Sequence, residues 1–162
     1  MPIVPKDKSS YYWTWQDYLL VEKARSISEL AVIALRIIGL MSKPIVQVCG
    51  PLSTGGLGSL SANQERFSLA INILHHRSRG CYRVFDQMPF QGAMARLTER
   101  RRKSGYPREI LYQFYLPIFK SSNIQLAYFL SGWQESVGAR WEHQTAPKYG
   151  IRIKDFPDRW FN

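Results

Sequence analysis

The chain has 162 residues and carries 22 Lys and Arg against 12 Asp and Glu, a formal net charge of +10. This length corresponds to one domain, and a hydrophobic fraction of 45% is enough for a packed core, which excludes disorder of the whole chain. Two cysteines are too few for a disulfide framework and lack the spacing of a zinc site, so the sequence predicts a protein of a reducing, cytoplasmic compartment. The longest apolar run, residues 30–41, contains an arginine and is shorter than the roughly 20 residues that span a bilayer, so no membrane segment is expected.

The first 40 residues predict an arm followed by a helix. Residues 1–14 mix proline, lysine, serine and aromatic residues without a period, whereas a helical period runs from Trp15 to about Leu40. Ser28 is either an N-cap or a local interruption of this helix. One helix face is apolar and must pack on the main domain or on a second subunit; its members are Leu30, Ile33, Ala34, Ile37 and Ile38.

Strands and helices alternate over the rest of the chain. A β-branched run over 44–50 predicts a buried strand, a loop of small residues covers 51–62, and an amphipathic helix covers about 63–78. Further along, we expect a strand over 81–85, a basic loop or short helix over 93–107, a helix over 107–120 that Pro117 kinks or ends, a strand over 124–130, a helix over 137–148 and a strand over 150–153. Cys49 and Cys81 are expected as small core residues of the first two strands.

This order of elements predicts an α/β fold. Parallel strands joined by helices form a sheet that is covered on both faces, so we expect a three-layer, Rossmann-like or flavodoxin-like domain with a mostly parallel sheet of about four or five strands. The domain is expected to cover 43–162, and residues 1–42 to form an N-terminal arm and helical extension. In such sheets, ligands bind beyond the carboxyl ends of the strands.

Two segments that follow strands carry the residues of a candidate ligand site. The first is Gly50-Pro51, with the small-residue loop behind it and Asn63 in the next helix. The second is Gly-Trp-Gln-Glu-Ser-Val-Gly-Ala-Arg-Trp-Glu over 132–142. Together they resemble the nucleoside 2-deoxyribosyltransferase-like family, which includes small enzymes that hydrolyse the N-glycosidic bond of nucleoside 5'-monophosphates. The resemblance covers about 43–154, and the matching residues of the second segment are Gly132, Trp133, Ser136, Gly138, Ala139 and Glu142.

Glu142 is the candidate nucleophile that this resemblance implies. Cleavage of the C1'–N bond builds positive charge on the sugar, and a carboxylate beside the anomeric carbon can stabilise that charge or form a covalent glycosyl intermediate. Ser136 and Val137 lie at the start of the same helix, where free N–H groups and the helix dipole suit a 5'-phosphate. The small residues Gly138 and Ala139 are expected to let the sugar approach the backbone closely. Trp133 and Phe90 are expected to help enclose the base.

The loop after the first strand is the second half of the expected pocket. Backbone N–H groups of a loop without bulky side chains can hold a phosphate or a sugar hydroxyl, with the hydroxyl of Ser53 or of Thr54 as a further donor. The expected binding residues here are Gly50, Pro51, Ser53, Gly55, Gly56 and Asn63. The segment is not a Walker loop, because no Gly-Lys-Ser/Thr follows, and neither a cofactor nor a metal is expected.

Two carboxylates of the family pattern have no counterpart in this sequence. In relatives, one aspartate lies in the helix before the strand that leads to the Gly-Trp motif, and another lies immediately before that strand. The corresponding positions hold Tyr115, or Tyr112 if the register differs by one turn, and Asn123. Tyr115 is therefore a candidate hydroxyl donor, and Asp86, after the second strand, is either a candidate acid or a loop cap. General acid–base catalysis contributes typically about 10²- to 10⁴-fold, so the chain is either an enzyme without this help or a nucleotide-binding, regulatory protein.

Most of the positive charge is concentrated after the first helix of the expected domain. Residues 75–108 hold nine Lys and Arg against two acidic residues, with Arg100-Arg-Arg-Lys103 at the centre. This run is interpreted as a solvated loop, as a lid over a phosphorylated ligand, or as a contact with nucleic acid. Nucleic acid is the less favoured partner, because aromatic residues are not interleaved with the run. We expect a nucleoside or nucleoside 5'-monophosphate as ligand, a homo-oligomer as assembly, and water or a second base as acceptor of the sugar.

Overall fold

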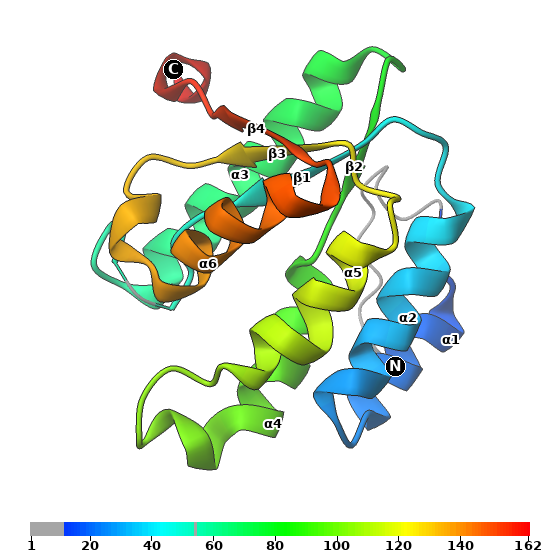
Figure 1. The fold of residues 1–162 in the computed structure, drawn as a ribbon, viewed down its shortest axis with the longest axis vertical. Coiled ribbons are helices and arrows are strands. Elements are labelled where there is room, and N and C mark those ends of the chain that lie inside the picture. Colours follow the sequence, from blue (N-terminus) through cyan, green and yellow to red (C-terminus); the bar gives the residue numbers. More distant parts are fainter. Residues whose placement is uncertain (1–11, 54) are drawn as a thin grey trace.

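A four-stranded parallel sheet forms the centre of the molecule (Figure 1). The computed structural model describes residues 12–53 and 55–162, so most of the predicted N-terminal arm and Thr54 lie outside the described residues. The strands are β1 (Ile45–Cys49), β2 (Arg83–Phe85), β3 (Leu126–Phe129) and β4 (Arg152–Asp155), in the spatial order β2-β1-β3-β4. All neighbouring strands pair in parallel, which confirms the predicted α/β fold with a parallel sheet.

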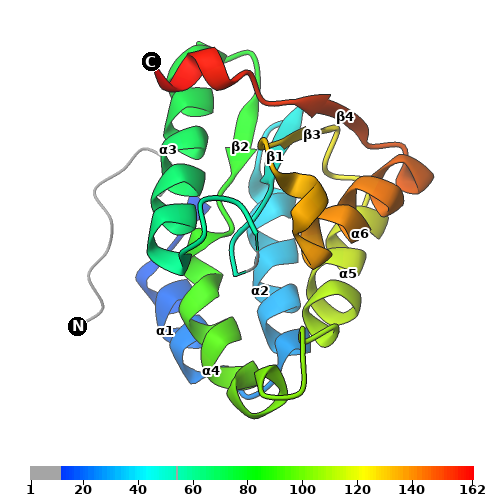
Figure 2. The same cartoon turned by 90° about the vertical axis from the view of Figure 1, so that its left-hand side faces the viewer.

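Helices cover both faces of this sheet, as Figure 2 shows. Helix α3 (Leu60–Ser78) packs on one face, where Val46, Val48 and Val84 of the sheet meet its apolar side. The other face is covered by α2 (Ile27–Leu40), α5 (Leu116–Lys120) and α6 (Val137–Thr145), while α1 (Trp15–Lys23) and α4 (Gln91–Arg102) lie at the lower end in both views. The alternation of side chains along the central strand β1 supplies both layers of the core, which gives the three-layer arrangement.

The N-terminal helical segment is two helices rather than the single helix expected from Trp15 to Leu40. The hydroxyl of Ser26, not Ser28, accepts a hydrogen bond from the backbone N–H of Glu29 and begins α2. An ion pair between Asp17 on α1 and Arg36 on α2 holds the two helices together. The apolar face of α2 packs against the helical turn Leu111–Tyr115 and α5 within the core under the sheet, so the main domain covers it.

Other boundaries differ from the sequence expectation by a few residues, the basic segment takes the helical one of its two predicted forms, and Pro117 does not end its helix. Helix α3 begins at Leu60, three residues earlier than expected, because the Ser59 hydroxyl caps it. The basic segment is the regular helix α4, and Pro117 stands in the first turn of α5 after a π-helical turn at Leu111–Tyr115. Cys49 is buried as expected, whereas Cys81 precedes β2 and is exposed, so its predicted place in the core is wrong.

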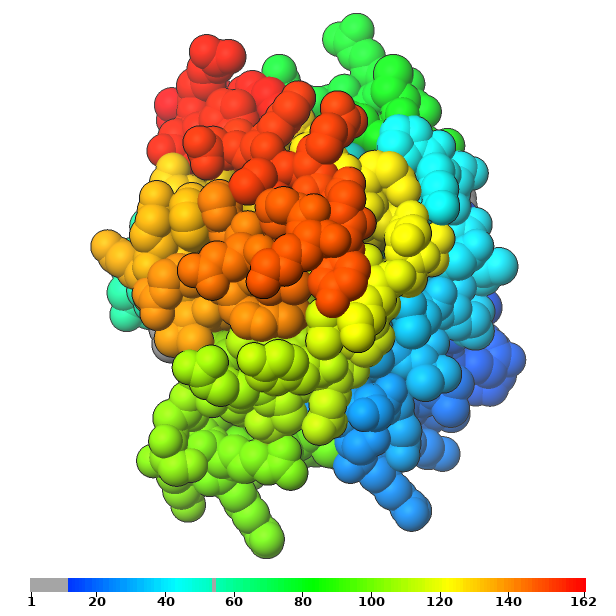
Figure 3. All heavy atoms as spheres, in the orientation of Figure 1, coloured from blue at the N-terminus to red at the C-terminus, as the bar shows by residue number. Residues whose placement is uncertain are grey.

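The surface in Figure 3 is formed largely by α6, the turn Ala146–Tyr149 and β4, with the end of α4 and its following loop at the lower edge. Side chains at this lower edge project into solvent. None of the helices in the described part of the chain has both the length and the apolar character needed to cross a bilayer.

Candidate functional site

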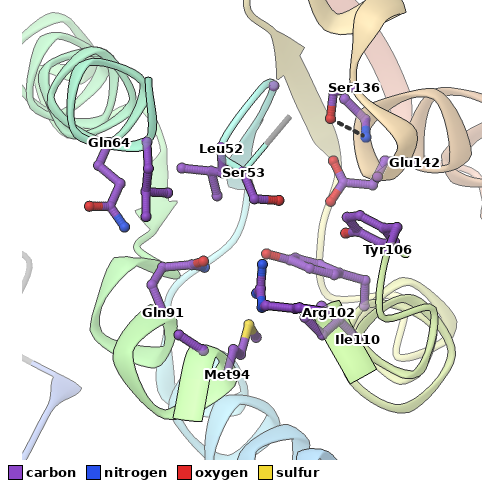
Figure 4. Close-up of a pocket in the computed structure, with 16 residues that line it drawn as sticks. Leu52, Ser53, Gln64, Gln91, Met94, Arg102, Tyr106, Ile110, Ser136 and Glu142 are labelled. Atoms are coloured by element: carbon purple, nitrogen blue, oxygen red, sulfur yellow. Dashed lines mark hydrogen bonds between the residues drawn. The ribbon is translucent and has the colours of Figure 1, made fainter. Parts of the chain in front are cut away.

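A cavity of about 190 Å³ opens beyond the carboxyl end of β1. Two walls form it, and they face each other in Figure 4. The sheet-end wall comes from the segment after β1, the start of α3, and α6 with its cap; its residues are Gly50, Leu52, Ser53, Leu60, Gln64, Ser136, Gly138, Ala139 and Glu142. The helical wall comes from α4 and from the segment 106–115; its residues are Gln91, Met94, Ala95, Arg102, Tyr106, Ile110 and Tyr115. The cavity therefore lies where open α/β sheets bind their ligands.

Glu142 projects from α6 into this cavity, with only 6% of its surface exposed. Burial raises the pKa of its carboxyl from 4.5 to about 7, because the charged form loses hydration, and the adjacent Cys49 thiol at the end of β1 offsets part of this rise. Near neutral pH the carboxyl therefore populates both its protonated and its charged form. A buried carboxyl with this pKa is typical of catalytic and ligand-binding sites.

The first turn of α6 places polar backbone groups on the same wall as Glu142. The Ser136 hydroxyl accepts a hydrogen bond from the Ala139 N–H at 3.2 Å, which caps the helix. The N–H groups of Val137 and Gly138 belong to the first turn and have no acceptor within the helix. Together with the helix dipole, these groups favour an anionic ligand at this end of the cavity.

Two tyrosines approach Glu142 from the helical wall. Tyr115 is buried in the cavity, whereas Tyr112 is 52% exposed and packs against Trp141, so the register without a one-turn shift is the one that faces the cavity. Burial and then the Glu142 carboxylate raise the pKa of both Tyr115 and Tyr106. Both phenols therefore keep their protons at neutral pH and can act as hydrogen-bond donors, and the Tyr115 hydroxyl also interacts with the Gln91 side chain.

Tyr106 was not predicted as a site residue, and its position depends on a glycine in the other wall. A Cβ atom at Gly138 would lie 2.6 Å from the Tyr106 hydroxyl oxygen, which is closer than such atoms approach. Gly138 therefore lets the phenol reach α6. The sequence motif indicated the glycine correctly, but the partner that needs it comes from a segment about 30 residues earlier.

The loop after β1 is built around Asn63. Its amide nitrogen donates to the carbonyl oxygens of Leu52 (3.1 Å) and Gly55 (3.0 Å), and its amide oxygen accepts from the Leu57 N–H (2.8 Å). Gly56 has a φ of 66°, and a Cβ there would lie 2.5 Å from the Asn63 amide oxygen. Asn63 thus holds the loop in shape rather than lining the cavity.

Of the residues expected in this loop, Gly50 and Ser53 line the cavity. Pro51 is buried beneath the loop, against the positions of Gly56 and Gly132. Gly55 lies against Glu135, with a φ of 69°. Pro51, Gly55 and Gly56 are not among the lining residues, so they shape the loop instead.

Three predicted site residues lie away from the cavity lining. The Asp86 carboxylate accepts a hydrogen bond from the Met88 N–H at 2.9 Å, which is the loop cap that was one of its two interpretations. Phe90 is fully buried in the core, with its ring against Phe114. Trp133 stacks on His143, with ring centroids 3.9 Å apart, and does not line the cavity that would hold a nucleotide base.

Arg102 lines the cavity, but the sequence does not distinguish it from the other residues of the basic run. Its Nε donates to the Thr98 hydroxyl at 2.9 Å, and that hydroxyl donates to the Met94 carbonyl at 2.7 Å. Arg101 instead pairs with Glu109 on the far side of the helix end. A helical interpretation of the segment would have placed Gln91, Met94, Ala95 and Arg102 on one face, because their spacing follows the helical period.

No protein-family model, curated protein or solved structure matches this chain. Any functional assignment must therefore come from the cavity itself. What the cavity offers is one buried carboxyl, the first turn of its helix, two phenols and one guanidinium, arranged on two walls.

Proposed function

We propose that the protein binds a nucleoside 5'-monophosphate in this cavity and cleaves its N-glycosidic bond, with Glu142 as the nucleophile. The observation that carries this proposal is the buried Glu142 carboxyl at the carboxyl end of the sheet, one to two turns from the start of its own helix. The resemblance of residues 132–142 to the nucleoside 2-deoxyribosyltransferase-like family supports the same assignment.

In the proposed complex, the phosphate lies at the first turn of α6 and the sugar lies over Glu142. Ser53 and Gly138 line the wall that would hold the phosphate, and the Gly138 N–H has no acceptor within the helix. The sugar lies between Gly50, at the start of the loop after β1, and the start of α6. This geometry directs the anomeric carbon toward the carboxylate.

The reaction then proceeds in two steps. The Glu142 carboxylate bonds to C1' while the C1'–N bond breaks and its electron pair leaves with the base. An acceptor, either water or a second base, next attacks C1', breaks the ester bond and restores the carboxylate. Tyr115 keeps its proton and donates a hydrogen bond that orients Glu142 or the sugar.

A nucleotide-binding regulatory protein is the second candidate function. It is favoured by one observation: Glu142 is the only carboxylate among the described residues that line the cavity. A pocket without a carboxylic acid as second proton donor can bind the same ligand and turn it over slowly or not at all. Assembly into a dimer or larger oligomer and a cytoplasmic location stay predictions from the sequence.

The test is release of free base from nucleoside 5'-monophosphates, separated by chromatography, for the wild-type protein and Glu142→Gln. We expect the wild type to release base and Glu142→Gln to lose this activity by at least about 10³-fold, because an amide cannot form the glycosyl ester. Glu22→Gln, an exposed glutamate of α1, is the matched control and should behave as the wild type.

Two other outcomes would change the assignment. Undiminished base release by Glu142→Gln would show that Glu142 is not the nucleophile. Saturable nucleotide binding by the wild type with no base released would replace the enzyme with the binding protein.

A further inference from the structure

Arg102 is the only cation among the described residues that line the cavity. Its Nε donates a hydrogen bond to the hydroxyl of Thr98, whose side chain is fully buried, and this bond orients the guanidinium group. The two terminal nitrogens make no hydrogen bond or ion pair with any residue in the described part of the chain. They are therefore available to a ligand.

The guanidinium and the Glu142 carboxylate lie on opposite walls of the cavity, and Tyr106 lies beside Glu142. Both charges act on the Tyr106 hydroxyl: the carboxylate raises its pKa and the guanidinium lowers it. Figure 4 shows the Tyr106 ring beside Glu142, and Arg102 with Tyr106 on the helical wall. The cavity thus has a negative end at Glu142 and a positive end at Arg102.

The apolar part of the lining places the base near the positive end. Met94, Ala95 and Ile110 belong to the helical wall and offer a surface for a flat ring. The phosphate and sugar are expected at the sheet-end wall, where the α6 N–H groups and Ser53 lie. A nucleotide held in this way has its C1'–N bond directed from Glu142 toward Arg102.

Cleavage moves negative charge in that same direction. Before attack the charge is on the Glu142 carboxylate, and after C1'–N cleavage it is on the departing base. A fixed cation at the receiving end stabilises this transition state more than the ground state, which is the requirement for catalysis. The two tyrosines are poor substitutes as acids, because burial and the carboxylate raise the pKa of both.

We propose that Arg102 is a catalytic residue that stabilises the departing base as an anion, in place of a carboxylic acid that would protonate it. This inference rests on the proposed function. In the first step the Glu142 oxygen bonds to C1' and the base leaves with the electron pair of the C1'–N bond, paired with the guanidinium. In the second step water adds its oxygen to C1', the ester bond breaks, and the proton lost by water balances the proton that the base takes up in solution.

The proposal also specifies the class of base. The anion of an oxo-pyrimidine such as uracil, formed at the leaving N1, spreads its negative charge onto O2 and O4, and a guanidinium can bind N1 and the adjacent O2 through two N–H groups. A base that must be protonated on the ring before it leaves gains little from a cation. We therefore expect 5'-monophosphates of oxo-pyrimidines to be preferred over those of aminopurines.

The first experiment compares two substrates with the same sugar, the nucleoside 5'-monophosphates of uracil and of 5-fluorouracil. They differ in the stability of the anion that the departing base forms. We expect Arg102→Gln to lower kcat for the uracil substrate by about 10- to 100-fold, the range for a lost hydrogen bond to a charged group. The loss should be smaller for the 5-fluoro substrate, whose anion is more stable by itself. Arg100→Gln, an exposed arginine of the same helix, should leave both rates unchanged.

A phosphate-binding role for Arg102 would give a different pattern. It would raise KM for both substrates and leave the ratio of their kcat values as in the wild type. That result overturns the proposal.

The second experiment needs no turnover. Barbiturate is a flat pyrimidine anion at neutral pH, and uracil is its neutral counterpart, so their affinities can be compared by ligand-observed NMR. We expect the wild type and Arg100→Gln to prefer barbiturate, and Arg102→Gln to lose about 10-fold in barbiturate affinity with little change for uracil. Equal barbiturate affinity in the wild type and Arg102→Gln overturns the role of Arg102.

The two experiments separate this proposal from the proposed function. Base release by the wild type with an unchanged leaving-group ratio in Arg102→Gln overturns the Arg102 proposal and retains the enzyme. Absence of base release together with Arg102-dependent barbiturate binding overturns the enzyme and retains Arg102 as the residue that recognises an anionic base.

Discussion

At the scale of single residues, the buried carboxyl of Glu142 makes stability depend on pH. Its pKa is about 7 in the folded protein against an ordinary value of 4.5, so the folded state holds the proton more tightly than the unfolded chain. The resulting stabilisation is complete below about pH 4.5 and is lost as pH rises through about 7. Glu142→Gln is always neutral. We therefore expect its free energy of unfolding, relative to that of the wild type, to increase by on the order of 3 kcal/mol as the pH rises from 5 to 8. Urea unfolding of both proteins at these two pH values measures this gain, and a difference independent of pH would contradict it.

At the scale of elements, strand β1, its loop and helix α3 form one unit that Asn63 closes. Asn63→Ala leaves the Leu57 N–H and the Leu52 and Gly55 carbonyl oxygens without their partner. We expect a loss of about 1–3 kcal/mol in the free energy of unfolding, and faster proteolysis within residues 51–58. Gln64→Ala, the neighbouring amide of α3, is the control, because no hydrogen bond ties it to the loop in the described structure. Unchanged proteolysis in Asn63→Ala would show that the loop is held by other contacts.

At the scale of the whole molecule, α2 belongs to the core under the sheet. Leu30 is fully buried in that core, whereas Val32, two residues along, is 67% exposed. We expect Leu30→Ala to lower the free energy of unfolding by about 2–5 kcal/mol in a single transition, and Val32→Ala to have an effect within about 0.5 kcal/mol. Circular dichroism and tryptophan fluorescence should report the same transition. Two separate transitions in either protein would instead show that the N-terminal helices unfold independently of the sheet.

The sequence predicted those parts of the structure that depend on local patterns. The β-branched run of β1, the alternation of strands with helices, and the segment from Gly132 to Glu142 each carry their signal within about ten residues. The sequence predicted Ser28 as a candidate cap, whereas Ser26 caps α2 in the structure; residue type does not distinguish the two serines.

The parts that could not be predicted depend on contacts between distant segments. Arg102 and Tyr106 line the same cavity as Glu142 because α4 folds back beneath the sheet, and no local period contains that information. Phe90 and Trp133 show the converse: an aromatic side chain fits a pocket wall and a core equally well, and here both pack away from the cavity. A buried ring gives no indication in the sequence of which side of it a ligand would occupy.

The two walls of the cavity come from different parts of the chain, and this has a consequence for how such a protein can change. The helical wall lies on α4 and the segment 106–115, whereas Glu142 and the first turn of α6 belong to the sheet-end wall. Substitutions at Met94, Ala95 or Ile110 therefore reshape one wall without moving the carboxyl on the other. Divergence, in nature or in a laboratory library, can alter which ring is accepted while the bond-breaking residue is inherited unchanged.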